Sequence, residues 1–178
     1  MRIVSGIHKG RRISAPKNLP VRPTTDFAKE ALFNILNNYY HFSALEVIDL
    51  FSGTGNISYE FASRGAIKIT AVDAHSECIR FINKTSDELE MPISGIKSDV
   101  LKYLESTKTK ANIIFADPPY DFENLVLQKM VDLIFENQLL YDGGMFIIEH
   151  SKKMDLSSIP QFSDQRKYGN SVFSFFNN

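Results

Sequence analysis

The pattern of hydrophobic and polar positions changes its period repeatedly between residues 46 and 150. Short apolar runs alternate with stretches in which apolar residues recur at helical spacing. The expected strands are "EVIDLF", "IKITAVD", "PISGIKSD", "ANIIFAD" and "GGMFIIEH", and the expected helices are "NISYEFASRGA", "SECIRFINKTSDELEM", "VLKYLEST" and "FENLVLQKMVDLIFENQLL". Strands that alternate with helices predict an α/β fold with a parallel sheet and right-handed crossovers.

The N-terminal segment precedes this alternation. "RIVSG" and "GRRISA" flank "IHK" and predict a small β-hairpin, after which the Pro-rich "PKNLPVRP" serves as a connector. "TTDFAKEALFNILNNYY" then carries apolar residues at the helical spacing of Phe27, Ala31, Leu32, Ile35 and Leu36. We therefore expect an arm with its connector over residues 1–24 and a domain over residues 25–178.

The C-terminal end predicts a second hairpin. "SDQRKYGNSVFSFF" contains two strand-like runs around Gly169-Asn170, a pair that favours a tight turn. The sheet is therefore expected to finish with an antiparallel strand, which a purely parallel dinucleotide-binding sheet does not need.

Charge is distributed unevenly, although the formal net charge is only -1. Residues 1–25 carry +6 and no acidic residue, so the remainder of the chain carries -7. A basic arm on an acidic body favours a polyanionic partner such as nucleic acid over an arm that is merely solvated. The six basic residues are Arg2, Lys9, Arg11, Arg12, Lys17 and Arg22.

Composition narrows the setting of the protein. Cys78 is the single cysteine, so an internal disulfide is impossible and a reducing cytoplasm is expected. No apolar run approaches the ~20 residues of a membrane helix. The four histidines are scattered without metal-ligand spacing. We therefore expect a cytoplasmic protein with neither a metal nor a membrane partner.

The stretch "VIDLFSGTGNIS" predicts a strand, a Gly-rich turn and the start of a helix. Gly53 and Gly55 allow a tight bend and a close approach to a ligand. Asp49 stands just before this loop, where a carboxylate repels a pyrophosphate and attracts a cationic amino-acid head. Ser58 occupies the place of the third glycine of the dinucleotide pattern. These residues favour S-adenosylmethionine over NAD, because it has a ribose, an adenine, an ammonium and a sulfonium but no phosphate.

Two further acids follow the next two predicted strands. Asp73 ends one strand, where an acid can hold the two hydroxyls of a ribose, and Asp99 follows the other, within reach of an adenine edge. Asp49, Asp73 and Asp99 each have an alternative interpretation, as a cap of a turn or of the following helix.

The fourth predicted strand ends in "DPPY". Pro118 and Pro119 fix φ and remove two donors, which makes the loop stiff. Asp117 and the Pro118 carbonyl then form a pair of acceptors for the two N–H groups of an exocyclic amine, and Tyr120 supplies a face for base stacking. Such a base must be flipped or unpaired to enter. The alternative is a rigid turn with a capping aspartate.

Five motifs together carry a resemblance over nearly the whole chain. "RIVSGIHKGRRI", "RPTTDFAKEALFNIL", "DLFSGTGNISYEFASRGA", "IFADPPY" and "KYGNSVFSF" resemble the RsmD family, S-adenosylmethionine-dependent enzymes that methylate N2 of one guanine in 16S ribosomal RNA. The resemblance implies a Rossmann-like, seven-stranded, mostly parallel sheet with an antiparallel last strand and an N-terminal hairpin arm. It also implies a partner, the 16S rRNA within an assembling small subunit, and we expect a monomer.

The resemblance assigns roles to single residues. Asp73 would bind the ribose of the cofactor and Asp99 its adenine. The methionine part would be lined by Asp49, Phe51, Gly53 and Gly55, with Thr24 of the family's "RPT" nearby. The guanine would be held by Asp117, Pro118, Pro119 and Tyr120. RNA would be contacted by Arg11, Arg12 and Arg22. The chain departs from the family at Phe27 and Lys29, where an arginine-rich version is common.

The loop of Asp117, Pro118, Pro119 and Tyr120, which we call the acceptor loop, does not by itself decide which base is methylated. It would serve the amine of adenine as well as that of guanine, so an adenine-N6 methyltransferase acting on DNA is the alternative function. The chain has no room for a separate DNA-recognition domain, which favours the RNA enzyme. A nucleic-acid-binding module with an inactive pocket and a dehydrogenase are weaker alternatives, since neither explains "DPPY".

Overall fold

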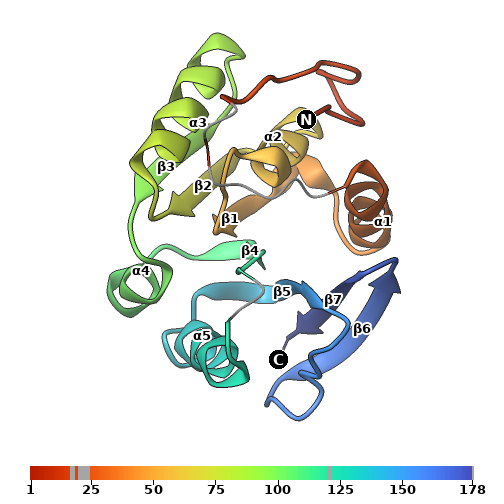
Figure 1. Ribbon diagram of the computed structural model, residues 1–178, viewed down its shortest axis with the longest axis vertical. Helices are drawn as coiled ribbons and strands as arrows, with labels where there is room; N and C mark the ends of the chain where they lie inside the picture. Colours follow the sequence, from red (N-terminus) through yellow and green to blue (C-terminus); the bar gives the residue numbers. More distant parts are fainter. Residues whose placement is uncertain (17–18, 20–24, 120–121, 178) are drawn as a thin grey trace.

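A seven-stranded mixed sheet runs through the middle of the protein (Figure 1). The computed structural model describes residues 1–16, 19, 25–119 and 122–177. The strands lie in the order β3-β2-β1-β4-β5-β7-β6. Their bounds are β1 Glu46–Leu50, β2 Lys68–Asp73, β3 Ile93–Lys97, β4 Ala111–Ala116, β5 Leu140–Ser151, β6 Phe162–Tyr168 and β7 Ser171–Phe176.

The direction of the strands agrees with the sequence pattern. Strands β1 to β5 are parallel, whereas β7 pairs antiparallel with β5 and β6 antiparallel with β7. Tyr168 lies opposite Ser171, and Gly169, with a φ of 63°, makes the tight turn between them. The prediction of a mostly parallel sheet with an antiparallel end is therefore confirmed.

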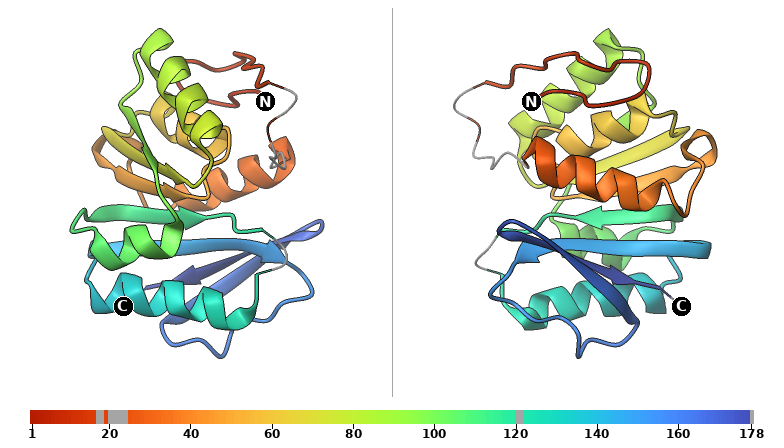
Figure 2. Two further views of the ribbon diagram at one scale, coloured as in Figure 1. Left: turned by 60° about the vertical axis from the view of Figure 1, so that its left-hand side comes forward. Right: turned by 90° about the vertical axis from the view of Figure 1, so that its right-hand side faces the viewer.

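Helices cover both faces of this sheet (Figure 2). On one face lie α1 Asp26–Leu36, α2 Asn56–Ser63 and α3 Ser76–Glu88; on the other lie α4 Val100–Ser106 and α5 Asn124–Glu136. A short 3-10 turn, Phe42–Ala44, leads into β1. Because both faces are covered, the central strands β1 and β4 are buried at all but one position each, as the near-continuous apolar runs predict.

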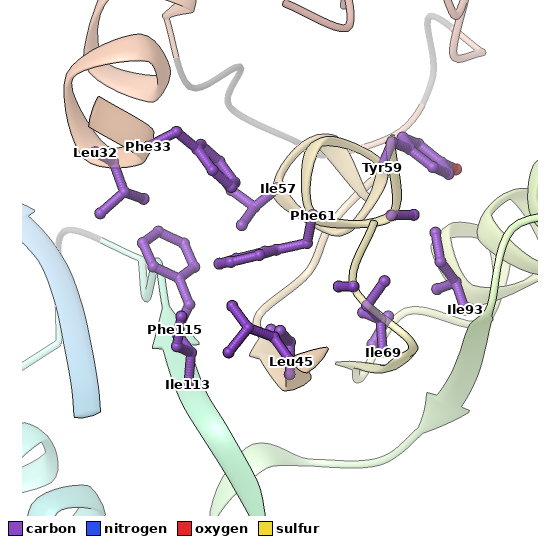
Figure 3. Close-up of a cluster of buried hydrophobic side chains, with 14 of the residues drawn as sticks. Leu32, Phe33, Leu45, Ile57, Tyr59, Phe61, Ile69, Ile93, Ile113 and Phe115 are labelled. Atoms are coloured by element: carbon purple, nitrogen blue, oxygen red, sulfur yellow. The ribbon is translucent and has the colours of Figure 1, made fainter. Parts of the chain in front are cut away.

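The core under α1, α2 and α3 is built largely from aromatic side chains (Figure 3). Phe33 of α1 meets Phe61 of α2 with ring centroids 4.6 Å apart, and Phe115 of β4 packs below them. Burying an aromatic or aliphatic side chain of this size stabilises the fold by about 1.5–3 kcal/mol. This packing fixes α2, and with it the loop that precedes α2, on the sheet.

Helix α1 buries a different face from the one on which its apolar residues recur in the sequence. It buries Ala28, Lys29 and Phe33 together with Leu32 and Leu36, while Phe27 is 66% exposed. Phe27, one of the apolar residues at helical spacing, is thus not part of the core. Lys29 faces the core instead, where its Nζ lies 3.5 Å from the buried Glu60 carboxylate.

The N-terminal arm folds back on itself, but its pairing is shorter than a regular hairpin. Arg2 and Arg12 form one isolated antiparallel bridge, and the Ile3 amide donates to the Arg11 carbonyl at 2.9 Å. Between them the chain bends onto the end of α2, where the Ile7 amide donates to the Ser63 carbonyl at 2.8 Å. The two predicted strands are thus reduced to a bridge, because docking on α2 takes up the backbone groups that a longer ladder would use.

A buried carboxylate fixes the arm to the domain. Glu60 of α2 is fully buried and accepts hydrogen bonds from the backbone amides of Val4 and Ser5, at 2.8 and 3.0 Å. Lys29 lies 3.5 Å from the same carboxylate and donates to the Arg2 carbonyl at 2.6 Å. Lys29 is 1% exposed, so this side chain does not reach a phosphate on the surface.

Candidate active site

A cavity of about 930 Å³ opens at the carboxyl ends of the parallel strands. Ligands bind at this edge in open α/β sheets. Loops that follow β1, β2, β3 and β4 all contribute to it. The predicted site residues that line it are Asp49, Phe51, Gly53, Asp73, Asp99, Asp117, Pro118 and Pro119.

The remaining predicted residues fall outside this lining. Gly55 lies just behind it, at the N-cap of α2. Arg11 and Arg12 border a second, smaller cavity. Tyr120, Thr24 and Arg22 lie outside the described residues, so their predicted roles stay predictions.

The glycine loop turns sharply between β1 and α2. Phe51, Gly53 and Gly55 have φ of 57°, 52° and 85°, in the left-handed region that favours glycine. A Cβ at Gly55 would lie 2.9 Å from the Tyr59 ring, so a side chain there meets steric resistance as well as strain. Phe51 adopts this conformation without being a glycine, and its ring faces the cavity wall against Phe122.

Asp73 holds the glycine loop from the neighbouring strand. One carboxylate oxygen accepts from the Gly53 amide at 2.8 Å, and the other accepts from the His75 amide at 2.8 Å. Each oxygen of a carboxylate has a further lone pair, so the same group retains acceptor capacity for ligand hydroxyls. Asp73 therefore sets the loop in place as well as lining the cavity.

Asp49 lies beneath the loop and is 2% exposed. Its Oδ2 accepts from the Ser58 amide at 3.1 Å and from the Ser58 hydroxyl at 2.5 Å. Ser58 is the third residue of α2, so the capping interpretation that the sequence left open is seen in the structure. Burial raises the pKa of Asp49 to about 7; the Ser58 hydrogen bonds oppose this rise and the charge of Asp73 adds to it.

Asp99 also caps a helix. It is the N-cap residue of α4, and its Oδ1 accepts from the Lys102 amide at 3.1 Å. It remains exposed and lines the cavity at the end of β3. Capping and a contact with a ligand use different lone pairs of one carboxylate, so the two roles are compatible.

The acceptor loop begins where β4 ends. The Asp117 amide donates to the Leu50 carbonyl at 3.4 Å, which places this residue next to the end of β1. Pro118 is buried and Pro119 exposed, and the Pro119 carbonyl accepts from the Phe122 amide at 3.1 Å. Phe122 then meets Phe51 edge to face, with ring centroids 5.3 Å apart. The glycine loop and the acceptor loop are therefore in contact.

Sequence reasoning missed the residues that close the cavity. Phe122 follows "DPPY" by two positions, and its aromatic character was the available signal. The arm also contributes, although nothing in its own sequence indicates that it lies over the cavity. Its lining residues are Met1, Ile13, Ser14, Ala15, Pro16 and Leu19.

Cys78 completes one wall of the cavity as a buried thiol. Burial, followed by the charges of Asp73 and Glu77, raises the pKa of this thiol to about 11. A protonated, buried thiol is a poor nucleophile. Cys78 thus serves as a buried packing residue of α3 at the cavity wall.

The lining of the cavity is acidic. Among the described residues, it holds four aspartates, Asp49, Asp73, Asp99 and Asp117, and no lysine or arginine side chain. Such a lining disfavours a pyrophosphate and suits a cationic ligand with hydroxyls to donate. A sulfonium compound with a ribose and an ammonium fits these donors and acceptors.

Basic residues gather instead on the outside of the arm. The exposed Arg11 and Arg12 line a cavity of about 470 Å³ between the arm and α3, opposite Arg80 and Lys84. The two α3 cations pair with acids of their own helix, at 2.8 and 3.8 Å. The arginines therefore flank the acidic cavity and do not enter it.

The described residues contain no group of three histidine, cysteine, aspartate or glutamate side chains that could hold a metal ion. In that same part of the chain, every helix is too short or too polar to cross a membrane.

Solved structures with the same fold define the class of protein. The putative methyltransferase yhhF from Escherichia coli matches with a TM-score of 0.86 and 26% identity, over 99% of this chain and 96% of that one. A Thermus thermophilus 16S rRNA N2 methyltransferase, RsmC, was solved with AdoMet and guanosine; it shares the fold at a TM-score of 0.69 and 19% identity, over 89% of this chain and 45% of that one. The fold is that of a Rossmann-like methyltransferase.

Sequence relatives then give the family. The chain belongs to the family described as "Conserved hypothetical protein 95", whose model matches residues 1–177. The putative rRNA methyltransferase YlbH of Bacillus subtilis is 32% identical over 161 residues, 88% of this chain and 85% of that protein. Ribosomal RNA small subunit methyltransferase D of Buchnera aphidicola subsp. Acyrthosiphon pisum is 34% identical over 157 residues, 86% and 80% of the two chains. The resemblance to the RsmD family is confirmed.

Proposed function

We propose that this protein transfers a methyl group from S-adenosylmethionine to the exocyclic N2 of a guanine in 16S rRNA of the small ribosomal subunit. One observation carries the proposal: the rigid Asp117-Pro118 acceptor pair borders the same acidic cavity as Asp49 and Asp73. The family supports the reaction class, since its relatives are named as rRNA methyltransferases. A cytoplasmic monomer acting on a partly assembled subunit is part of the proposal.

The cofactor would be held by carboxylates and backbone. Asp49 and the loop around Phe51 and Gly53 would face its amino-acid part, Asp73 its ribose hydroxyls and Asp99 the side of its adenine. When bound, S-adenosylmethionine supplies an electrophilic methyl group on a sulfonium. The residues of the chain do the rest: they fix the ligand and exclude water from it.

The acceptor loop would orient the amine. Asp117 and the Pro118 carbonyl accept its two N–H groups, which aims the nitrogen lone pair away from the ring. Alignment of two reacting groups in this way lowers a barrier by roughly 7–11 kcal/mol. The N–C bond would form as the bond between the sulfonium and the methyl group breaks and leaves a neutral thioether. The amine nitrogen loses its proton only afterwards, so Asp117 needs no raised basicity. Tyr120 would stack on the base.

The assignment is tested by tritium transfer. Labelled S-adenosylmethionine is offered with duplex DNA, naked 16S rRNA, and small subunits from a strain that lacks this enzyme, and the labelled nucleoside is identified. We expect N2-methylguanosine from the RNA or the subunit. N6-methyladenine in DNA would replace the proposal with the DNA enzyme, and no label anywhere would refute both.

The acceptor role of Asp117 has its own test. Asp117→Ala should lower the transfer rate by about 10²–10³-fold, the usual loss when one oriented polar contact to a transition state is removed. Calorimetry should show nearly unchanged cofactor binding. Asp142→Ala is the matched control, because Asp142 is exposed at the start of β5, at the opposite edge of the sheet. Full activity in Asp117→Ala would rule out this role.

A further inference from the structure

An aromatic pair, formed by the exposed Phe27 and the half-buried Tyr168, stands beside the candidate active site. Phe27, on the first turn of α1, is 66% exposed. Its ring meets Tyr168 edge to face, with centroids 6.2 Å apart and an interplanar angle of 73°. Single exposed apolar residues are common on protein surfaces, so position and surroundings decide whether this pair has a use.

Tyr168 gives the pair a rigid base. It is the last residue of β6 and packs on the buried Phe173, with ring centroids 6.1 Å apart. Phe27 is held from the other side by α1, whose end lies next to the β6–β7 hairpin in both Figure 1 and Figure 2. A ring fixed in this way loses little conformational entropy when a ligand stacks on it.

Strand register places the pair at the same edge as the acceptor loop. Tyr168 lies opposite Ser171, and Ser171 lies opposite Ser151 at the carboxyl end of β5. Strand β5 in turn neighbours β4, which leads into Asp117. The path from β4 to β6 crosses three strand spacings of ~4.8 Å, so the pair stands roughly 15 Å from the acceptor loop.

The charge around the pair is suited to a polyanion. Lys152 and Lys153 directly follow Ser151, are exposed, and form no salt bridge within the described part of the chain. Two nearby acids are paired with cations, Asp26 with Arg2 at 3.2 Å and Asp164 with Arg166 at 2.7 Å. A third, Asp155, accepts a hydrogen bond from the Ser157 amide at 3.0 Å. Aromatic faces with lysines beside them are typical of single-stranded RNA recognition.

We propose that Phe27 and Tyr168 form a stacking platform for an unpaired nucleotide next to the target guanine. The proposal rests on the proposed function for its choice of RNA as the ligand. It adds a contact on the far side of the site from Arg11 and Arg12. A base extruded into the acceptor loop leaves its neighbours unstacked, and the platform offers one of them a replacement face.

The test measures RNA binding separately from methyl transfer. The probes are a fluorescein-labelled single-stranded RNA oligonucleotide and unmodified small subunits, with the wild type, Phe27→Ala, Phe27→Leu and Tyr39→Ala. Phe27→Leu keeps an apolar side chain against Tyr168 but has no ring. Tyr39 is the matched control, because it is an aromatic residue with 64% exposure that follows the other end of α1, roughly 18 Å away.

The expected result is a Kd for RNA raised roughly 5- to 100-fold in Phe27→Ala and in Phe27→Leu, with Tyr39→Ala and cofactor binding unchanged. Wild-type affinity in either Phe27 variant would overturn the platform. Absence of RNA binding by the wild type would overturn both the platform and the RNA substrate. Weakened binding by Phe27→Ala alongside methyl transfer to DNA alone would support the platform while refuting the proposed activity.

Discussion

Asp49 shows how burial changes the chemistry of one residue. Its pKa of about 7 means that a large share of the unliganded protein carries it protonated at neutral pH. A cationic ligand head favours the ionised form, so binding must drive a proton off. We therefore predict that, as pH rises towards 7, the Kd for S-adenosylmethionine falls about tenfold for each pH unit. Above pH 7 the Kd should level off. Calorimetry between pH 5.5 and 7.0 in two buffers would measure the affinity and the released proton.

Asp49→Asn is the control for this pH dependence. The amide keeps the size of the side chain but does not titrate, so the cofactor affinity of this variant should be weaker and should not change over the same pH range.

The pH dependence of stability tests the direction of the Asp49 pKa shift independently. Because the pKa of folded Asp49 lies above its ordinary value of 3.8, the unliganded wild type should lose unfolding free energy as pH rises from about 4 to 7. The same slope in Asp49→Asn would show that another group titrates.

At the scale of elements, Lys29 and Glu60 form the joint between the arm, α1 and α2. Lys29 donates to the Arg2 carbonyl at 2.6 Å and to Asn56 Oδ1 at 2.9 Å, and Asn56 lines the cavity. Burial lowers the pKa of Lys29, while the charge of Glu60 opposes this and keeps the ion pair. Removing one member of such a buried pair costs about 3–5 kcal/mol. Lys29→Met should therefore lower the free energy of unfolding by about that amount in urea titrations.

A surface pair of the same type provides the comparison. Lys84 and Glu88 lie 3.8 Å apart on α3, with the lysine 75% exposed. Lys84→Met should change the free energy of unfolding by no more than about 0.5 kcal/mol. If Lys29→Met lowered the free energy of unfolding as little as Lys84→Met, the ion pair of Lys29 and Glu60 would not contribute to stability beyond packing. A weaker cofactor affinity in Lys29→Met would show that the joint also sets Asn56.

The elements themselves could be predicted from periodicity, because the core decides which positions are apolar. Helix α2 ends at Ser63, and Gly65, with a φ of 106°, makes the turn after it, close to the end that the sequence indicated. The burial of Lys29 could not be predicted, since a lysine on a helix is ordinarily solvated and its partner stands 31 positions away in the chain. The bent arm has the same cause: its backbone partners on α2 are fixed by tertiary docking.

For the whole molecule, topology made the site predictable. Parallel strands bring every residue that follows them to one edge, so Asp49, Asp73, Asp99 and Asp117 had to lie near one another. The hydrogen bonds of these acids were not predictable, because they depend on side-chain packing around Ser58, Gly53 and Lys102. The closing of the cavity by the arm also required knowledge of how the arm docks.

The separation of charges gives the last prediction. Under the proposed function, the acidic cavity would bind the cofactor, and the basic residues on the arm beside it would bind the RNA. Arg11→Gln/Arg12→Gln should weaken RNA binding for all sequences, and reduce the slope of log K against log salt by about 1 for each arginine that contacts a phosphate. Cofactor affinity should not change. Filter binding at salt concentrations from roughly 50 to 300 mM would measure this slope for the wild type and the variant.

The matched control changes the same charge at the opposite edge of the sheet. Lys108 and Lys110 are exposed just before β4, so Lys108→Gln/Lys110→Gln also removes two positive charges, far from the cavity. If RNA binding depended only on net charge, the two double variants would behave alike. A local contact predicts a reduced salt slope for the arm variant alone. Equal slopes in both variants and the wild type would mean that RNA does not lie along the arm. The RNA would then have to contact the other side of the site, at the β6–β7 hairpin.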